Sequence, residues 1–172
     1  VEPFYFPSQF DEPGDISSWS VQAFGNQSDG AVAVAVARSS SRQPPEIWAQ
    51  VIGQVEPTRP VRISNHQAAL KDVQFAMQEP FFWQASDGLA LDGILIRPPV
   101  TTLASDNGRL PMVTLVHGGP YGRSGQALHL GWGAWGQWLA LTGFLVLLPN
   151  PRGGLGHGDK FASAARGAVG GA

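Results

Sequence analysis

The first 77 residues alternate between apolar and polar positions over short stretches, which is typical of antiparallel strands. Residues 31–37 alternate alanine and valine strictly, which predicts a strand with Val32, Val34 and Val36 on one face. Further strands are expected at 18–24, 46–51 and 60–63, with a turn at 26–30 and a polar loop at 42–45. This spacing is typical of a β-propeller blade. Another kind of antiparallel sheet fits this spacing equally well. No internal repeat in the sequence is long enough to decide between the two.

The pattern changes near Gln78. An apolar run at 81–85, the turn signal Ser86-Asp87-Gly88 and renewed alternation over 89–97 predict a β-hairpin. A slip in the alternation at Asp92-Gly93 is interpreted as a β-bulge. The side chains expected on the buried side of the second strand are Leu89, Leu91, Ile94 and Ile96.

A strand, a glycine-rich loop, a helix and a second strand are expected next. Residues 111–116 and 144–148 are apolar runs of the kind that is buried on both faces of a parallel sheet. Residues 128–142 have helical spacing, and Gly143 suits the position after the helix end. The apolar face of this helix is expected to include Leu130, Trp135, Trp138, Leu139 and Leu141. The order predicts a βαβ unit in an α/β fold.

The most informative motif is His117-Gly118-Gly119-Pro120, directly after the first of these two strands. Acyl transfer builds negative charge on a carbonyl oxygen, and a site for it needs N–H donors that are fixed in advance. Glycines let the backbone approach closely, and a His-Gly-Gly loop supplies an oxyanion donor in many α/β-hydrolases. We therefore interpret the loop as part of an oxyanion hole rather than as a plain turn.

A second glycine-rich motif, at 150–158, follows the last expected strand. It contains Arg152, Gly153, Gly154, Gly156 and Gly158 but has neither the G-x-x-x-x-G-K-[ST] pattern nor a clear G-x-G-x-x-G. A nucleotide site is therefore not favoured.

The two motifs, in this order around one helix, resemble the prolyl oligopeptidase family, which joins a β-propeller to an α/β-hydrolase domain and includes acylaminoacyl and dipeptidyl peptidases. The resemblance is carried by 86–99, 117–120, 143–161 and 167–171, and covers about 95 residues. It implies an α/β fold: residues 1–77 would be the C-terminal part of a propeller, and 78–172 the start of a hydrolase sheet. The segment Ser64-Asn65-His66 is similar to the one that precedes the domain crossover in such enzymes.

The resemblance also implies roles for a few residues. A backbone N–H of Gly118 or Gly119, in the loop that His117 begins, would donate to the oxyanion, and Arg152 would brace the loop beside the site. The Ser-Asp-His triad of the family is expected outside this chain, which contains no G-x-S-x-G. Gly122-Arg123-Ser124-Gly125-Gln126 lacks the last glycine, so Ser124 is not expected to be the nucleophile.

The implied function is that of a serine peptidase that cleaves short peptides through an acyl-enzyme, with this chain inactive by itself. An esterase or lipase-like hydrolase uses the same loop, and a non-catalytic binding module is the alternative outside enzymes. The expected partners are a peptide substrate and the remainder of the same polypeptide, with the oligomeric state left open.

The other polar and aromatic residues are not expected to form a site. His66, His129 and His157 have no metal-ligand spacing, and Asp87 and Asp92 do not form a paired-carboxylate acid. The spacing of Trp132, Trp135 and Trp138 is interpreted as a helix that packs aromatic side chains against its sheet. No metal and no cofactor are expected.

Composition narrows the picture further. Charged residues make up 14% of the chain, against roughly 25% in an ordinary domain, which fits a surface partly covered by more polypeptide. A net charge of −2 without a basic cluster argues against nucleic acid or an anionic membrane as a partner. No apolar run approaches the ~20 residues of a membrane helix. The absence of cysteine suits a reducing cytoplasm without excluding export, so the compartment is left open.

Overall fold

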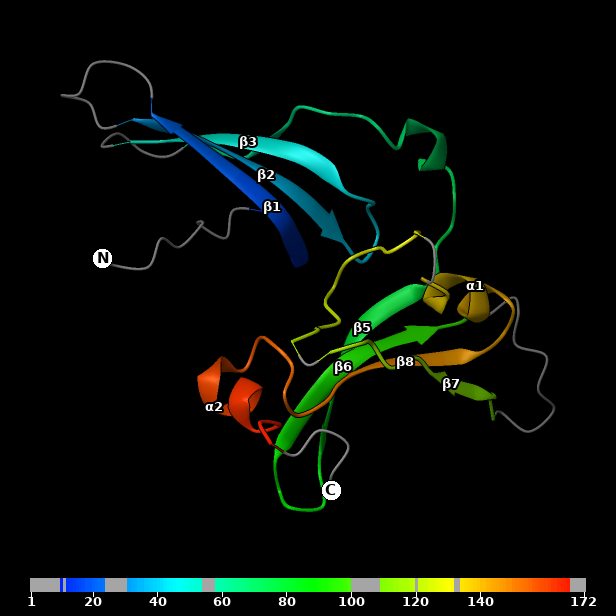
Figure 1. Cartoon of the computed structure of the whole chain (residues 1–172). Helices are drawn as coiled ribbons and strands as arrows, with labels where there is room; N and C mark the ends of the chain where they lie inside the picture. The colour runs from blue at the N-terminus through cyan, green and yellow to red at the C-terminus, as the bar shows by residue number, and fades with distance from the viewer. Residues whose placement is uncertain are drawn as a thin grey trace.

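The computed structural model describes Phe10 and residues 12–23, 31–53, 58–99, 109–119, 121–131 and 134–167. The described chain forms two four-stranded sheets, one from the N-terminal strands and one from the C-terminal strands. Figure 1 shows the first sheet in blue to cyan and the second in green to orange, linked by one extended segment with a short helical turn. No described helix is long and apolar enough to cross a bilayer.

The first sheet is an antiparallel meander in the order β1-β2-β3-β4. Its strands are β1 (Gly14–Ala23), β2 (Val32–Ser40), β3 (Glu46–Ile52) and β4 (Val61–Arg62). The four predicted strands are therefore confirmed, and Val34 and Val36 are each 2% exposed on the predicted apolar face. The predicted turn at 26–30 lies outside the described residues.

The link between the sheets contains the 3₁₀ turn η1 (Ala68–Leu70), and two buried side chains hold it at its ends. Near the start of the link, the Glu46 carboxylate accepts hydrogen bonds from the Ser64 hydroxyl and from the backbone N–H groups of His66 and Gln67. At the far end, the Gln137 amide bonds both backbone groups of Ala76, at 2.8 and 3.1 Å.

The second sheet is mixed, in the order β5-β6-β8-β7. The hairpin of β5 (Met77–Gln84) and β6 (Ala90–Arg97) is confirmed. The parallel pair of β7 (Met112–Thr114) and β8 (Leu145–Asn150) also agrees with the predicted βαβ unit, although β6 joins β8 antiparallel. Helix α2 (Gly158–Ser163) follows β8 and was not predicted.

The predicted bulge at Asp92-Gly93 is wrong, because β5 and β6 pair without a register shift from Met77 to Gln84. The apolar–polar alternation of 89–97 is interrupted at position 93 because the sheet requires a glycine there. A Cβ on Gly93 would lie 2.6 Å from the Leu148 carbonyl oxygen of the neighbouring strand. The continuous register puts Leu91 on the face opposite Ile94. Ile94, Ile96 and Leu95 are all buried, whereas Leu89 and Leu91 are only half-buried.

The predicted helix at 128–142 is much shorter, because α1 spans only Gly136–Leu141. The described residues before it, 128–131 and 134–135, are not helical, and the Leu128 N–H donates to the Ser39 hydroxyl of the first sheet at 2.9 Å. The helix ends as predicted. Gly143 has a φ of 101°, and the N–H groups of Gly143 and Phe144 reach back to Ala140 and Leu139 at 3.0 and 3.1 Å.

The predicted apolar face of this helix is wrong for Leu130, Leu141 and the two tryptophans, which are all exposed, and of the five expected residues only Leu139 packs against the core. Trp135 and Trp138 are 53% and 73% exposed, and the residues that α1 buries are Gly136, Gln137 and Ala140. A Cβ on Gly136 would lie 2.7 Å from Ile96 Cδ1, so the helix approaches the sheet too closely for a tryptophan between them. Trp132 lies outside the described residues.

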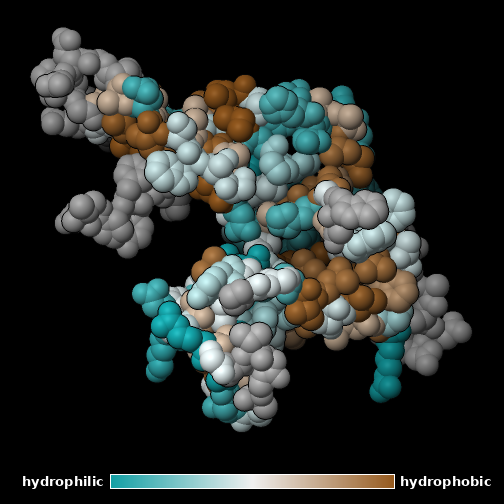
Figure 2. Space-filling view, in the orientation of Figure 1, coloured by the Kyte–Doolittle hydropathy of each residue, from teal (hydrophilic) through white to brown (hydrophobic). Residues whose placement is uncertain are grey.

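The core of the second sheet lies between α1 and the strands, and it consists of Ala76, Ile94, Ile96, Ala140 and Val146. The expected burial of 111–116 on both faces is wrong, since Met112 and Val116 are 56% and 69% exposed. β7 pairs only with β8 among the described strands and forms an edge of the sheet. Figure 2 shows hydrophobic side chains gathered on the surface where α1, β7 and β8 lie.

Candidate active site

The His117-Gly118-Gly119 loop leaves the sheet at the carboxyl end of β7. His117 is half-buried, and its Nδ1 lies 2.8 Å from the Gly118 carbonyl oxygen. Because a carbonyl only accepts, Nδ1 carries the hydrogen in this contact. Nε2 is buried and has no hydrogen-bond partner among the described residues. The ring therefore turns towards its own loop and stiffens it.

Gly118 and Gly119 are exposed, and neither backbone N–H donates a hydrogen bond to any described residue. A Cβ on Gly118 would meet nothing within 4 Å, and one on Gly119 would lie 3.7 Å from the Tyr121 nitrogen. These two N–H groups, which no described residue pairs, are thus available as donors to an oxygen beside the loop, as a developing oxyanion would need.

The two glycine-rich motifs pack against each other. The Leu155 N–H of the second motif donates to the Gly122 carbonyl at 3.1 Å. A Cβ on Gly122 would lie 2.3 Å from His117 Nδ1 and 2.4 Å from the Gly118 oxygen, so only glycine allows this approach. The structure thus brings the two segments into one unit beside the ends of β7 and β8.

A residue that sequence reasoning missed, Asn150, joins this unit most firmly. It is the last residue of β8, is 0% exposed and forms hydrogen bonds with both backbone groups of Ser124 and with Asp92. Its place at the end of an apolar strand and at the start of the second motif was a signal for it. In the sequence, the only residue of that motif to which the resemblance gives a role is Arg152.

Asp92 connects the same network to the second motif. Its Oδ1 accepts from Asn150 Nδ2 at 3.0 Å and lies 2.8 Å from His157 Nε2. The His157 ring also packs against Phe161 of α2, with ring centroids 4.5 Å apart. Of the three histidines expected to be surface or packing residues, His157 therefore has a specific charged neighbour.

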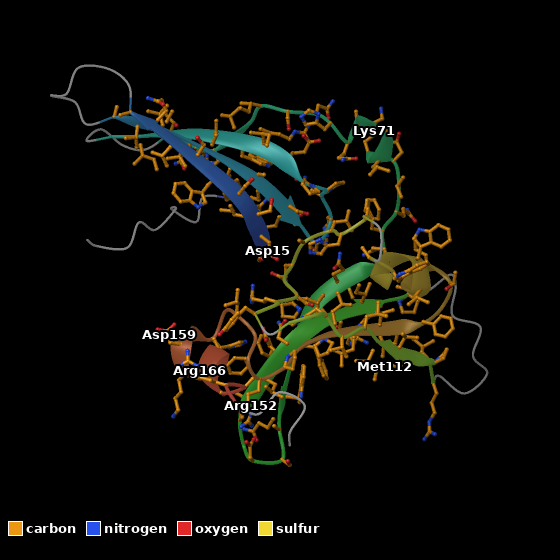
Figure 3. All side chains as sticks on the ribbon, viewed as in Figure 1. Asp15, Lys71, Met112, Arg152, Asp159 and Arg166 are labelled. Atoms are coloured by element: carbon orange, nitrogen blue, oxygen red, sulfur yellow. The ribbon has the colours of Figure 1, made fainter. Side chains whose placement is uncertain are left out.

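Arg152, labelled in Figure 3, pairs with Asp87 in the β5–β6 turn and with none of the described residues of the His117 loop. Both side chains are about half exposed, and the Leu89 N–H donates to the other oxygen of Asp87 at 3.1 Å. The Arg152 hydrogen bond is the main reason that the pKa of Asp87 is lowered, and the Leu89 hydrogen bond adds to it. Arg152 thus ties the second motif to the hairpin.

Replacing Arg152 by alanine is expected to raise the pKa of Asp87 towards its ordinary value of 3.8, because the main stabilising donor of the carboxylate is lost. NMR titration of selectively labelled aspartate carboxyls would measure this change. Any stability that the pair contributes is present above the ordinary pKa and is lost as the pH falls through the lowered one. Arg152→Lys keeps the cation and should retain part of the shift. An Asp87 pKa that is unchanged in Arg152→Ala would contradict the assignment.

Ser124 is not placed as a nucleophile. Its backbone is bound by Asn150, and its hydroxyl forms no hydrogen bond with a histidine in the part of the chain that the structure describes. His129 is exposed, and His66 donates its backbone N–H to Glu46. The described residues contain no group of three or more metal-ligating side chains.

The first sheet touches the segment that follows the loop. The Arg123 guanidinium lies 3.9 Å from the Asp15 carboxylate, at the end of β1 that faces the second sheet (Figure 3). A cavity of about 430 Å³ opens beside His117, between this segment, α1 and the strands. Leu115, Val116 and Trp135 are among the residues that line it.

Comparison with known proteins identifies peptidases. The chain is 45% identical over 58 residues to dipeptidyl aminopeptidase BIII of Pseudoxanthomonas mexicana, over 34% of this chain and 8% of that protein. It is 28% identical over 129 residues to the uncharacterized peptidase YuxL of Bacillus subtilis, over 75% of this chain and 18% of that one. No family model matches the chain.

Solved structures give the same result. An acylaminoacyl peptidase in complex with Z-Gly-Gly-Phe-chloromethyl ketone superposes with a TM-score of 0.66 at 20% identity, over 92% of this chain and 22% of that one. The acylaminoacyl peptidase of Pyrococcus horikoshii gives 0.63 at 19% identity, over 90% and 21%. A puromycin-hydrolyzing peptidase of Mycobacterium tuberculosis gives 0.61 at 20% identity, over 77% and 20%.

The chain thus spans about a fifth of the structures it matches and less of the curated relatives. Within that span, both sheets follow the fold of these peptidases over most of the chain. The resemblance is therefore confirmed: this chain is similar in fold to acylaminoacyl peptidases of the prolyl oligopeptidase family and, over part of its sequence, to a dipeptidyl aminopeptidase.

Proposed function

We propose that the full-length protein is a serine peptidase of the prolyl oligopeptidase type that cleaves short peptides. This chain would supply the oxyanion side of the site, through the loop from His117 to Gly119. The observation that carries the proposal is the pair of exposed backbone N–H groups of Gly118 and Gly119, which donate to no described residue. The similarity to peptidases supports it, and one of the structural neighbours holds a peptide-like inhibitor.

In the proposed reaction, a serine outside this chain attacks the peptide carbonyl and forms a tetrahedral intermediate. Its negative oxygen is held by a loop N–H and by the N–H of the residue after the serine. The intermediate expels the amine and leaves an acyl-enzyme, which water then hydrolyses. Residues 1–77 would belong to a propeller that restricts access, and residues 78–172 to the hydrolase domain.

Labelling of the full-length protein with a fluorophosphonate, followed by intact mass, tests the proposal. Addition of one probe to a serine beyond residue 172, together with cleavage of short peptide amides, is the expected result. Cleavage of esters alone would favour an esterase. No labelling of the folded protein would favour a binding module. A probe on Ser124 would show that the nucleophile assignment is wrong.

A further inference from the structure

The Asn150 side chain forms hydrogen bonds with both backbone groups of Ser124. Its Oδ1 accepts from the Ser124 N–H at 2.7 Å, and its Nδ2 donates to the Ser124 carbonyl at 2.9 Å. The second hydrogen of Nδ2 goes to Asp92 Oδ1 at 3.0 Å. The amide is fully buried, and both of its donor hydrogens are used.

The backbone of Ser124 decides which way the amide points. Its N–H only donates and its carbonyl only accepts, so the oxygen of Asn150 must face the N–H and the nitrogen must face the carbonyl. Asp92 then accepts the remaining hydrogen of Nδ2. The two side chains are directly opposite each other in the β6–β8 register, which places them together through the sheet itself.

Ser124 lies a few positions after the loop that contains the proposed N–H donors. The loop begins at the end of β7, so the sheet fixes its near end. Its far end is fixed at Ser124 by Asn150 and at Gly122 by the Leu155 N–H, 3.1 Å away. Neither Gly118 nor Gly119 donates its backbone N–H to a described residue, so the direction of these N–H groups depends on these anchors and on the His117 Nδ1 contact with the Gly118 carbonyl.

We propose that Asn150 is a positioning residue for the oxyanion loop and acts through the Ser124 backbone, which rests on the function proposed above. It touches no reacting atom. Loss of the two hydrogen bonds between Asn150 and Ser124 would let the loop shift. A shift of about 1 Å in a catalytic group can lower the rate about 100-fold. Because the oxyanion forms only in the transition state, kcat should fall and KM should change little.

The test compares Asn150→Ala with Gln137→Ala in the full-length protein. Gln137 is a matched control because its buried amide makes the same two-sided contact with a backbone residue, Ala76, in the link between the sheets. Peptide kinetics and the rate of fluorophosphonate labelling report on the site. Hydrogen–deuterium exchange of the 117–125 segment reports on the loop without requiring activity.

Asn150→Ala is expected to lower kcat and the labelling rate roughly 10- to 100-fold, with KM within about twofold, and to speed exchange in 117–125. Gln137→Ala should leave all three unchanged per folded molecule, although it also loses stability. Equal losses in both variants, a change in KM alone, or unchanged exchange in Asn150→Ala would each overturn the proposal. A wild-type protein without labelling or cleavage would overturn the proposed function, and the exchange data would still show whether Asn150 holds the loop.

Discussion

Proline in place of the glycine proposed to donate to the oxyanion is expected to lower kcat of the full-length protein about 100- to 1,000-fold, with KM little changed. Proline removes the backbone N–H and leaves the carbonyl in place. Gly118→Pro and Gly119→Pro are both needed, because each N–H is exposed and donates to no described residue. Steady-state kinetics on a short peptide amide would measure the effect.

Alanine at the same positions is the control for the change in side chain. A Cβ at Gly118 meets nothing within 4 Å, and one at Gly119 stays 3.7 Å from its nearest neighbour, while neither glycine has a positive φ. Gly118→Ala and Gly119→Ala should therefore keep most of the activity. If both proline variants keep full activity, or if the alanine variants lose as much as the proline variants, backbone donation from this loop is wrong.

Glutamine in place of Glu46 is expected to lower the free energy of unfolding at neutral pH by about 2–3 kcal/mol. The Glu46 carboxylate is 5% exposed and accepts hydrogen bonds from the Ser64 hydroxyl and from the N–H groups of His66 and Gln67. An amide nitrogen cannot accept any of these donors, so at least one would be left buried and unpaired. Urea unfolding of the full-length protein, followed at the transition that involves the first sheet, would measure the loss.

The pH dependence of the difference in unfolding free energy between the wild type and Glu46→Gln shows whether the negative charge of Glu46, rather than the shape of its side chain, is responsible. Burial raises the pKa of Glu46, but the hydrogen bonds from Ser64, Gln67 and His66 outweigh burial and hold it below its ordinary value of 4.5. The stabilisation is therefore complete above the ordinary pKa and is lost as the pH falls through the lowered one. The wild type and Glu46→Gln should converge in acid.

Glu79→Gln is the matched control for Glu46→Gln. Glu79 forms an exposed ion pair with Arg97 at 2.5 Å, a kind of contact that contributes little in water. This variant should lose no more than about 0.5 kcal/mol. A Glu46→Gln loss of the same size, or one that does not shrink in acid, would show that Glu46 does not anchor the link.

Much of the fold follows from local patterns. The alanine–valine alternation marks β2, Ser86-Asp87-Gly88 marks the turn of the hairpin, and Gly143 marks the end of α1, because each depends on residues close together in the chain. The length of α1 does not follow from its periodicity. The segment before α1 is bound by a distant part of the chain, since the Leu128 N–H donates to the Ser39 hydroxyl of the first sheet, 89 positions away.

The candidate site also has one part that is visible in the sequence and one part that is not. The His117-Gly118-Gly119 loop could be identified from its residue types, because glycine and the preceding strand are both visible in the sequence. The contacts of Asn150 and Arg152 could not. Asn150 holds Ser124 across 26 positions and Asp92 across 58, and Arg152 pairs with Asp87 across 65.

The sequence by itself thus determined the strands, the hairpin, the βαβ order and the place of the glycine-rich loop after β7, since alternation, turn chemistry and glycine content act over a few residues. Only the tertiary structure decided which faces are buried, that Trp135 and Trp138 lie in solvent, and that Asn150 and Gly122 hold the loop. These outcomes depend on how closely distant segments approach. That distance is set where the sheets and α1 pack, as at Gly93 and Gly136, where a single Cβ would meet a neighbouring strand.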